Sequence, residues 1–246
     1  MRNLPSIRSV IYSVALTLML PATLSHADEV TPSGGNRSSM VDADFSGGAE
    51  HVRFDDAARE LTSVYPILIA SASQVVQNSF NWNGPVDASL RCDIGFTPDA
   101  VVVRGEFVDD YPFCQPIARP AMPEWWMITY GGDGIQFTFD DPTSASRRVS
   151  FVLNFGSRAT RPEVNLMASQ TRPAGIISTA DFELFDGQAP VNNGGQRAVM
   201  FRAAVPIAAL GDSRLFSGPL RITLRMHDLD GDWSTYQVLQ EVIERK

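Results

Sequence analysis

Apolar and polar residues alternate with a period of two along several stretches of this chain. Between residues 220 and 227, Leu, Ile, Leu and Met occupy one set of alternate positions, and Arg, Thr, Arg and His occupy the other. Such a period places apolar side chains on one face of a β-strand and polar side chains on the opposite face. The alternation predicts strands over residues 90–96, 101–108, 135–139, 149–155, 199–205 and 220–227.

Turn signals separate these strands. The Thr-Pro-Asp-Ala sequence of Thr97–Ala100 predicts a hairpin between the first two strands. Helical signals are weak, and the best candidates are residues 56–63 and 240–245. One buried and one solvated face per strand is typical of an antiparallel β-sandwich. We therefore expect a single all-β domain of the jelly-roll or immunoglobulin-like kind.

The N-terminal residues predict export. Arg2 and Arg8 precede an apolar run, Ile11–Leu24, and Ser25-His26-Ala27 supplies small residues for cleavage. The run is shorter than the roughly 20 residues of a membrane span and contains a proline. We therefore expect a periplasmic or secreted protein without stable membrane insertion. The expected parts are a signal peptide over residues 1–27, a flexible leader over 28–53 and the sandwich over 54–246.

Charge and composition narrow the classes of function. The 246-residue chain carries a formal net charge of −8, which argues against a nucleic-acid partner because phosphates need a basic face. Three His and two Cys leave little material for a His/Cys zinc site. The GxSxG, P-loop, HExxH and CxxC motifs are absent from the sequence. No pair of carboxylates stands out for glycoside hydrolysis. We therefore expect a protein that is not an enzyme.

Five segments, in this order, resemble the carbohydrate-binding module family 9-like domain, a relative of the DOMON-type sandwiches. The segments are Trp82–Leu90, Ala100–Asp110, Gly132–Asp140, Met200–Gly211 and Met226–Asp232. The resemblance implies a non-catalytic β-sandwich, often calcium-containing, in a family that includes binders of sugar ends between aromatic rings. The chain departs from the family pattern at Arg202, where the family has a Glu.

Aromatic residues at predicted strand ends are the candidate saccharide-binding residues. Flat rings cover the apolar C–H faces of a sugar at little entropic cost, and carboxylates, amides or Arg then bind its hydroxyls. Burial in the core is the alternative for each Trp. The candidate ring residues are Trp125, Trp126, Tyr130 and Trp233, with Asp133 and Arg202 as polar partners.

An acidic turn near the C-terminus is the candidate metal site. Asp228, Asp230 and Asp232 alternate around Gly231, and their carboxylate oxygens suit Ca2+. The turn lacks the register and the closing Glu of an EF-hand. A solvated hairpin turn is the alternative. Other carboxylates would add ligands if their loops converge, namely Asp109, Asp110, Asp133, Asp140 and Asp141.

The two cysteines, Cys92 and Cys114, form the candidate disulfide. Export permits such a bond. The alternative is a buried free thiol at Cys92, which shares an alternating apolar strand face with Leu90 and Ile94.

These patterns together favour an exported carbohydrate-binding-like domain that recognises a saccharide or polysaccharide through loop aromatics, with calcium stiffening a loop. A protein-interaction or adhesion sandwich without a sugar site is the main alternative. A glycan-active hydrolase is a further alternative. The DOMON kinship adds a haem or redox module, in which His227 or a Met would be the axial ligand.

Overall fold

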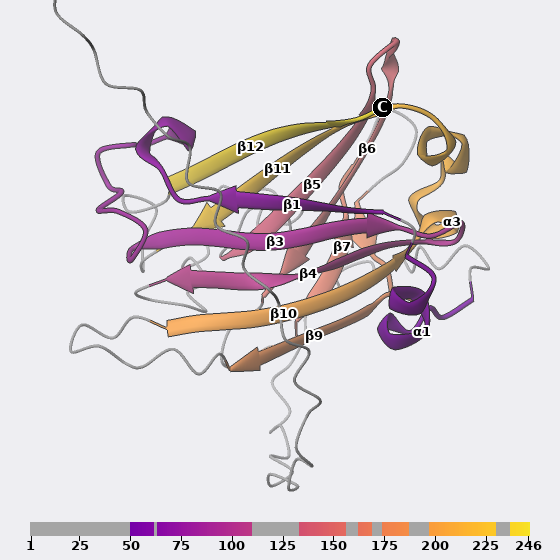
Figure 1. The fold of residues 1–246 in the computed structure, drawn as a ribbon, viewed down its shortest axis with the longest axis horizontal. Helices are drawn as coiled ribbons and strands as arrows, with labels where there is room; N and C mark the ends of the chain where they lie inside the picture. Colours follow the sequence, from indigo (N-terminus) through magenta and orange to yellow (C-terminus); the bar gives the residue numbers. More distant parts are fainter. Residues whose placement is uncertain are drawn as a thin grey trace, which may run out of the picture. The chain divides into compact units, whose positions relative to one another are not determined.

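Two antiparallel β-sheets form the protein, as the period-two alternation predicts (Figure 1). The structure is a computed structural model. It describes residues 50–61, 63–109, 133–155, 162–168, 174–186, 197–229 and 237–246. The five-stranded sheet has the order β1 (Val64–Ile69), β3 (Ala88–Phe96), β4 (Ala100–Asp109), β10 (Arg197–Pro206) and β9 (Asp181–Asp186).

The second sheet has seven strands among the described residues. Their order is β2 (Val75–Gln77), β12 (Gln237–Arg245), β11 (Leu220–Asp228), β5 (Gly134–Asp141), β6 (Ser144–Asn154), β7 (Glu163–Leu166) and β8 (Gly175–Ile176). Short helices complete the described part, namely α1 (Phe54–Arg59), η1 (Ala72–Gln74), α3 (Ile207–Leu210) and η2 (Ser213–Ser217). The expected all-β sandwich is therefore confirmed.

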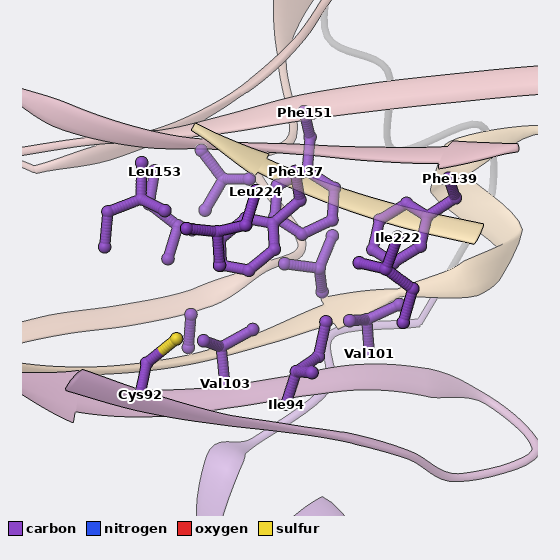
Figure 2. Packing of buried hydrophobic residues seen from close by; sticks show 14 of the residues in the cluster. Cys92, Ile94, Val101, Val103, Phe137, Phe139, Phe151, Leu153, Ile222 and Leu224 are labelled. Atoms are coloured by element: carbon purple, nitrogen blue, oxygen red, sulfur yellow. The ribbon is translucent and has the colours of Figure 1, made fainter. Parts of the chain in front are cut away.

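The core lies between the two sheets (Figure 2). Phe137 of the seven-stranded sheet stacks on Phe139 and on Phe151, with 5.2 Å between the ring centres of Phe137 and Phe151, and the rings of Phe139 and Phe151 are tilted against each other. Ile94 and Val103 of the five-stranded sheet point toward these rings from the opposite side. Within the strands predicted from the sequence, the core residues occupy the alternate positions assigned to the buried face, while β1, α3 and η2 add further core residues.

The predicted hairpin is confirmed between β3 and β4. Phe96 faces Val101 in the register of the two strands. The side-chain oxygen of Thr97 accepts hydrogen bonds from the backbone N–H groups of Asp99, at 3.2 Å, and Ala100, at 2.9 Å. These bonds close the tight Thr-Pro-Asp-Ala turn, as expected for a hydroxyl at the first turn position.

Of the two predicted helices, one is wrong and one is confirmed with different bounds. Residues 240–245 are not helical but belong to β12, which pairs along its whole length with β11. Pairing of Ile243 with Ile222 offers burial that a terminal helix turn lacks, so tertiary contacts outweigh local propensity. The predicted helix over residues 56–63 exists as α1, but it begins at Phe54 and ends at Arg59.

Helix α1 packs on the outer face of the five-stranded sheet. Phe54 and Ala57 contact Ala100, Val102 and Ala204 there, separate from the main core. The backbone N–H of Phe54 donates to the carboxylate of Asp181 at 2.8 Å, which satisfies one of the unpaired donors at the start of the helix. No helix in the described ranges combines the length and apolar character needed to cross a membrane.

Candidate metal centre

Three aspartates meet where the interior between the sheets ends. Each continues a column of buried apolar residues with the same period of two: Asp109 follows Phe107, Asp133 precedes Ile135, and Asp228 follows Met226. β4 and β11 finish, and β5 begins, at the same end of the sandwich (Figure 1). One sheet contributes Asp109 and the other contributes Asp133 and Asp228.

The three carboxylates are close and buried. One oxygen of each lies within 4.8 Å of the others. The exposed fraction of each residue is at most 1%. Like charges at this separation repel strongly where the dielectric constant is low. A bound cation would remove this repulsion and compensate for the loss of water.

Two neutral hydrogen-bond donors among the described residues contact this aspartate cluster of Asp109, Asp133 and Asp228. The backbone N–H of Leu229 donates to Oδ1 of Asp133 at 3.1 Å. The side-chain amide of Gln237 donates from Nε2 to Oδ2 of Asp228 and, at 3.1 Å, to Oδ2 of Asp87. The amide oxygen of Gln237 is buried and accepts no hydrogen bond in the described part of the chain. This oxygen is therefore a further atom at the edge of the cluster that suits a hard metal cation as a ligand.

The donor set fits a hard divalent cation. Calcium takes six to eight oxygen ligands from carboxylates, carbonyls and water. The cluster contains carboxylates without imidazole or thiolate, which favours calcium or magnesium over zinc. Asp228, which the acidic turn predicts as a ligand, belongs to the cluster, whereas Asp230 and Asp232 lie outside the described residues.

Two of the additional carboxylates weighed from the sequence converge on this site and two do not. Asp109 and Asp133 join Asp228 in the cluster. Asp140 and Asp141 lie at the far end of β5, where Asp140 pairs with Arg148 and Asp141 accepts hydrogen bonds from Thr143. Asp110 lies outside the described residues, so its role as a ligand stays a prediction.

His227 faces away from the aspartate cluster, because it neighbours Asp228 on the same strand. Its Nε2 lies 3.2 Å from Oε1 of Gln136, on the outer face of the seven-stranded sheet. Burial, with a smaller contribution from the charge of Arg225, lowers the pKa of His227 to about 3. The imidazole is therefore neutral at ordinary pH and supplies no counter-charge to the aspartates.

Arg202 lies away from Asp133, with which the sequence grouped it. It sits in β10 on the outer face of the five-stranded sheet, and its guanidinium donates to Glu183 at 2.8 Å and to Asp55 at 2.9 Å. Its cationic group also lies over the rings of Phe54 and Phe185, 5.2 and 5.1 Å from the ring centres. The structure therefore gives Arg202 contacts that hold α1 and β9 together.

Cys92 has no disulfide partner among the described residues, and its side chain is buried in the core. Its sulfur points into the space between the sheets, toward apolar neighbours (Figure 2). Burial, followed by the nearby charge of Asp93, raises the pKa of this thiol. These features support a buried packing residue, while Cys114 lies outside the described residues and the disulfide stays a prediction.

The predicted ring residues Trp125, Trp126, Tyr130 and Trp233 also lie outside the described residues. The segments that carry them nevertheless have described ends. Residues 110–132 connect Asp109 to Asp133, and residues 230–236 connect Leu229, next to Asp228, to Gln237. Both aromatic segments are therefore joined at both ends to the aspartate cluster or its immediate neighbours.

Comparisons with known proteins reveal distant structural similarity. No family model matches the sequence, and no curated protein matches it. A solved structure from Bacteroides uniformis ATCC 8492, described as a "putative carbohydrate-binding protein", superposes with a TM-score of 0.40 and 10% sequence identity. The match covers 74% of this chain and 80% of the other.

Proposed function

We propose that this chain is a non-catalytic saccharide-binding β-sandwich whose binding end is organised by Ca2+ at Asp109, Asp133 and Asp228. The observation that carries the proposal is the burial of three converging carboxylates at the ends of both aromatic segments. A cation there ties residues from two sheets to one point, and with them the ends of the segments that contain Trp125, Trp126, Tyr130 and Trp233. Asp230 and Asp232 are further candidate ligands of the same ion.

The proposed cation site and the aromatic rings have complementary roles. The cation supplies positive charge that fixes the carboxylates, and the aromatic rings supply flat apolar surfaces for the C–H faces of a sugar. A non-catalytic site needs only this fixed shape and a few directional hydrogen bonds. The resemblance of five segments to the carbohydrate-binding module family 9-like domain supports this function.

Calcium binding is tested by calorimetric titration of the chelator-treated protein with CaCl2. We expect the wild type to bind and Asp133→Asn to lose binding. Asp140→Asn is the matched control, because Asp140 lies at the opposite end of β5. Equal calcium binding by wild type and Asp133→Asn would remove the aspartate cluster from the proposal.

Saccharide binding is tested on a glycan array and on insoluble polysaccharides, in calcium and in EDTA. We expect binding that falls in EDTA and is lost in Trp233→Ala. A folded protein that binds no glycan under either condition would overturn the saccharide function. Binding that is identical in EDTA would separate the sugar site from the cation site.

A protein-binding sandwich is the second candidate function, and one surface favours it. Met200 and Phe185 are register partners on β10 and β9 and are 50% and 39% exposed. This apolar pair lies on the outer face of the five-stranded sheet, whereas the aspartates point into the interior between the sheets. If the protein binds no glycan in the screen, this outer face becomes the candidate site for binding another protein.

A further inference from the structure

The loop between β2 and β3, residues 78–87, presents an aromatic ring to solvent. Phe80 is 80% exposed, more than any other large apolar side chain in the described part of the chain. The other aromatic of the loop, Trp82, packs against the core and donates its ring N–H to the carbonyl of Ala88 at 2.9 Å. The loop thus holds one aromatic residue inward and leaves the other outside.

Hydrogen bonds fix the loop in this conformation. The carboxylate of Asp87 accepts the backbone N–H of Asn83 at 2.8 Å, and the backbone N–H of Asp87 donates to the carbonyl of Gly84 at 3.0 Å. Gly84 has a φ of 111°, which residues with a side chain rarely adopt. Across the first turn, the N–H of Asn81 donates to the carbonyl of Asn78 at 2.9 Å. The exposure of Phe80 is therefore not a consequence of a loose loop.

Gln237 connects this loop to the aspartate cluster. Its Nε2 donates both to Asp87, the last residue of the loop, and to Asp228, one of the three aspartates. The first residues of the loop also lie there, because Gln77 faces Val238 in the pairing of β2 with β12. Three residues of chain span at most about 10 Å, so the backbone of Phe80 stays close to the start of β12.

The sequence around Phe80 is polar but uncharged. No charged residue lies between Glu60 and Asp87, although charged residues make up 20% of the chain. The immediate neighbours in sequence are amides and a hydroxyl, contributed by Asn78, Ser79, Asn81 and Asn83. A flat ring flanked in sequence by neutral hydrogen-bonding groups suits a neutral polyhydroxylated ligand better than a charged one.

We propose that residues 78–87 form a third ligand-binding loop, in which Phe80 stacks on a neutral saccharide and Gln237 is the positioning residue that fixes the loop to the aspartate cluster. This inference rests on the proposed saccharide-binding function. It assigns the ligand class as an uncharged sugar and adds a ring to those of the two aromatic segments.

The test uses cellohexaose, xylohexaose, mannohexaose and chitohexaose as probes, titrated calorimetrically into the full chain with calcium present. Phe80→Ala should weaken binding of a hexasaccharide that the wild type binds by about three- to tenfold, the usual contribution of an aromatic contact. Phe80→Tyr keeps the ring and should retain wild-type affinity. Leu68→Ala is the matched control, because Leu68 is 61% exposed on the outer side of β1. Phe80→Ala should keep the melting temperature and the calcium affinity of the wild type.

The role of Gln237 is tested by a double-mutant cycle. Gln237→Leu should weaken hexasaccharide binding, and adding Phe80→Ala to it should cost less than Phe80→Ala costs alone. Additive effects would show that Gln237 does not position Phe80, and would overturn that half of the inference.

The outcomes separate the two proposals. A wild type that binds a hexasaccharide only as tightly as Phe80→Ala does overturns the inference and leaves the proposed function standing. A wild type that binds none of the four probes, and no glycan on the array, overturns the proposed function and the inference with it.

Discussion

The guanidinium of Arg202 lies over the ring of Phe54, 5.2 Å from the ring centre. This contact joins the middle of β10 to the first residue of α1, and the ion pair of Arg202 with Asp55 strengthens it at 2.9 Å. The helix is therefore attached to the outer face of the sheet by an aromatic ring that is also covered by a cation.

Replacing Arg202 should weaken the attachment of α1. We expect Arg202→Met to lower the free energy of unfolding by about 1–2 kcal/mol, because it removes two cation–π contacts and two partly exposed ion pairs. Urea denaturation measures the change. Arg104→Met is the control, since Arg104 pairs with the partly exposed Asp93 on the same face and should change stability less. Loss of saccharide binding in Arg202→Met without loss of stability would instead show that Arg202 contributes to saccharide binding.

Calcium should raise the melting temperature of the wild type. At a calcium concentration one hundred times the dissociation constant, binding to the folded state adds about 2.7 kcal/mol. For a domain of this size that corresponds to roughly 5–10 °C. We expect Asp109→Asn to abolish this shift in a thermal denaturation series, because Asp109 is the proposed ligand that the five-stranded sheet contributes. Asp141→Asn, at the far end of β5, should retain it.

Gly105 should not tolerate a side chain. A Cβ atom there would lie 2.5 Å from the carbonyl oxygen of Arg91 and 2.8 Å from the ring of Phe201. Because backbone of the neighbouring strand cannot move away freely, Gly105→Ala should cost roughly 1–3 kcal/mol. Gly218→Ala is the matched control, since nothing lies within 4 Å of the position that its methyl group would take. Chemical denaturation of both variants tests the difference, and equal stabilities would contradict the packing of β3 against β4.

The thiol of Cys92 should be unreactive in the folded protein. Burial raises its pKa, so the reactive thiolate is scarce at pH 8, and the sulfur lies between the sheets. We expect no reaction of Cys92 with a thiol reagent under native conditions, and full reaction after denaturation without reductant. Mass spectrometry of the alkylated protein identifies the site. A denatured protein in which Cys92 still fails to react would establish the disulfide with Cys114.

The fold was largely predictable because burial follows the alternation. The buried apolar residues that include Phe107, Ile135 and Met226 recur at alternate positions. Strands β4, β5 and β11 could therefore be predicted from residue types alone. Strand β1 could not, because Pro66 interrupts its pattern, and the edge position that tolerates this proline exists only in the assembled sheet.

The candidate site was predictable in part. The phase of the alternation already places Asp109, Asp133 and Asp228 on the buried face, which is a signal for a buried charge cluster. That Asp133 and Asp109 meet Asp228 depends on the pairing of β5 with β11 and the packing of two sheets, which a single sequence does not encode locally. Gln237 was missed altogether, because an amide at a strand start carries no distinctive pattern.

The directions of β4 and β12 also bear on how this protein can be attached to others. Helix α1 contacts Val102, seven residues and roughly 23 Å along β4 from Asp109. β12 likewise starts at Gln237, beside the aspartates, and runs away from them to Arg245. Helix α1 and the end of β12 therefore both lie at the end of the sandwich opposite the aspartates (Figure 1). A protein fused after β12 would therefore be attached at the end of the sandwich opposite the aspartates.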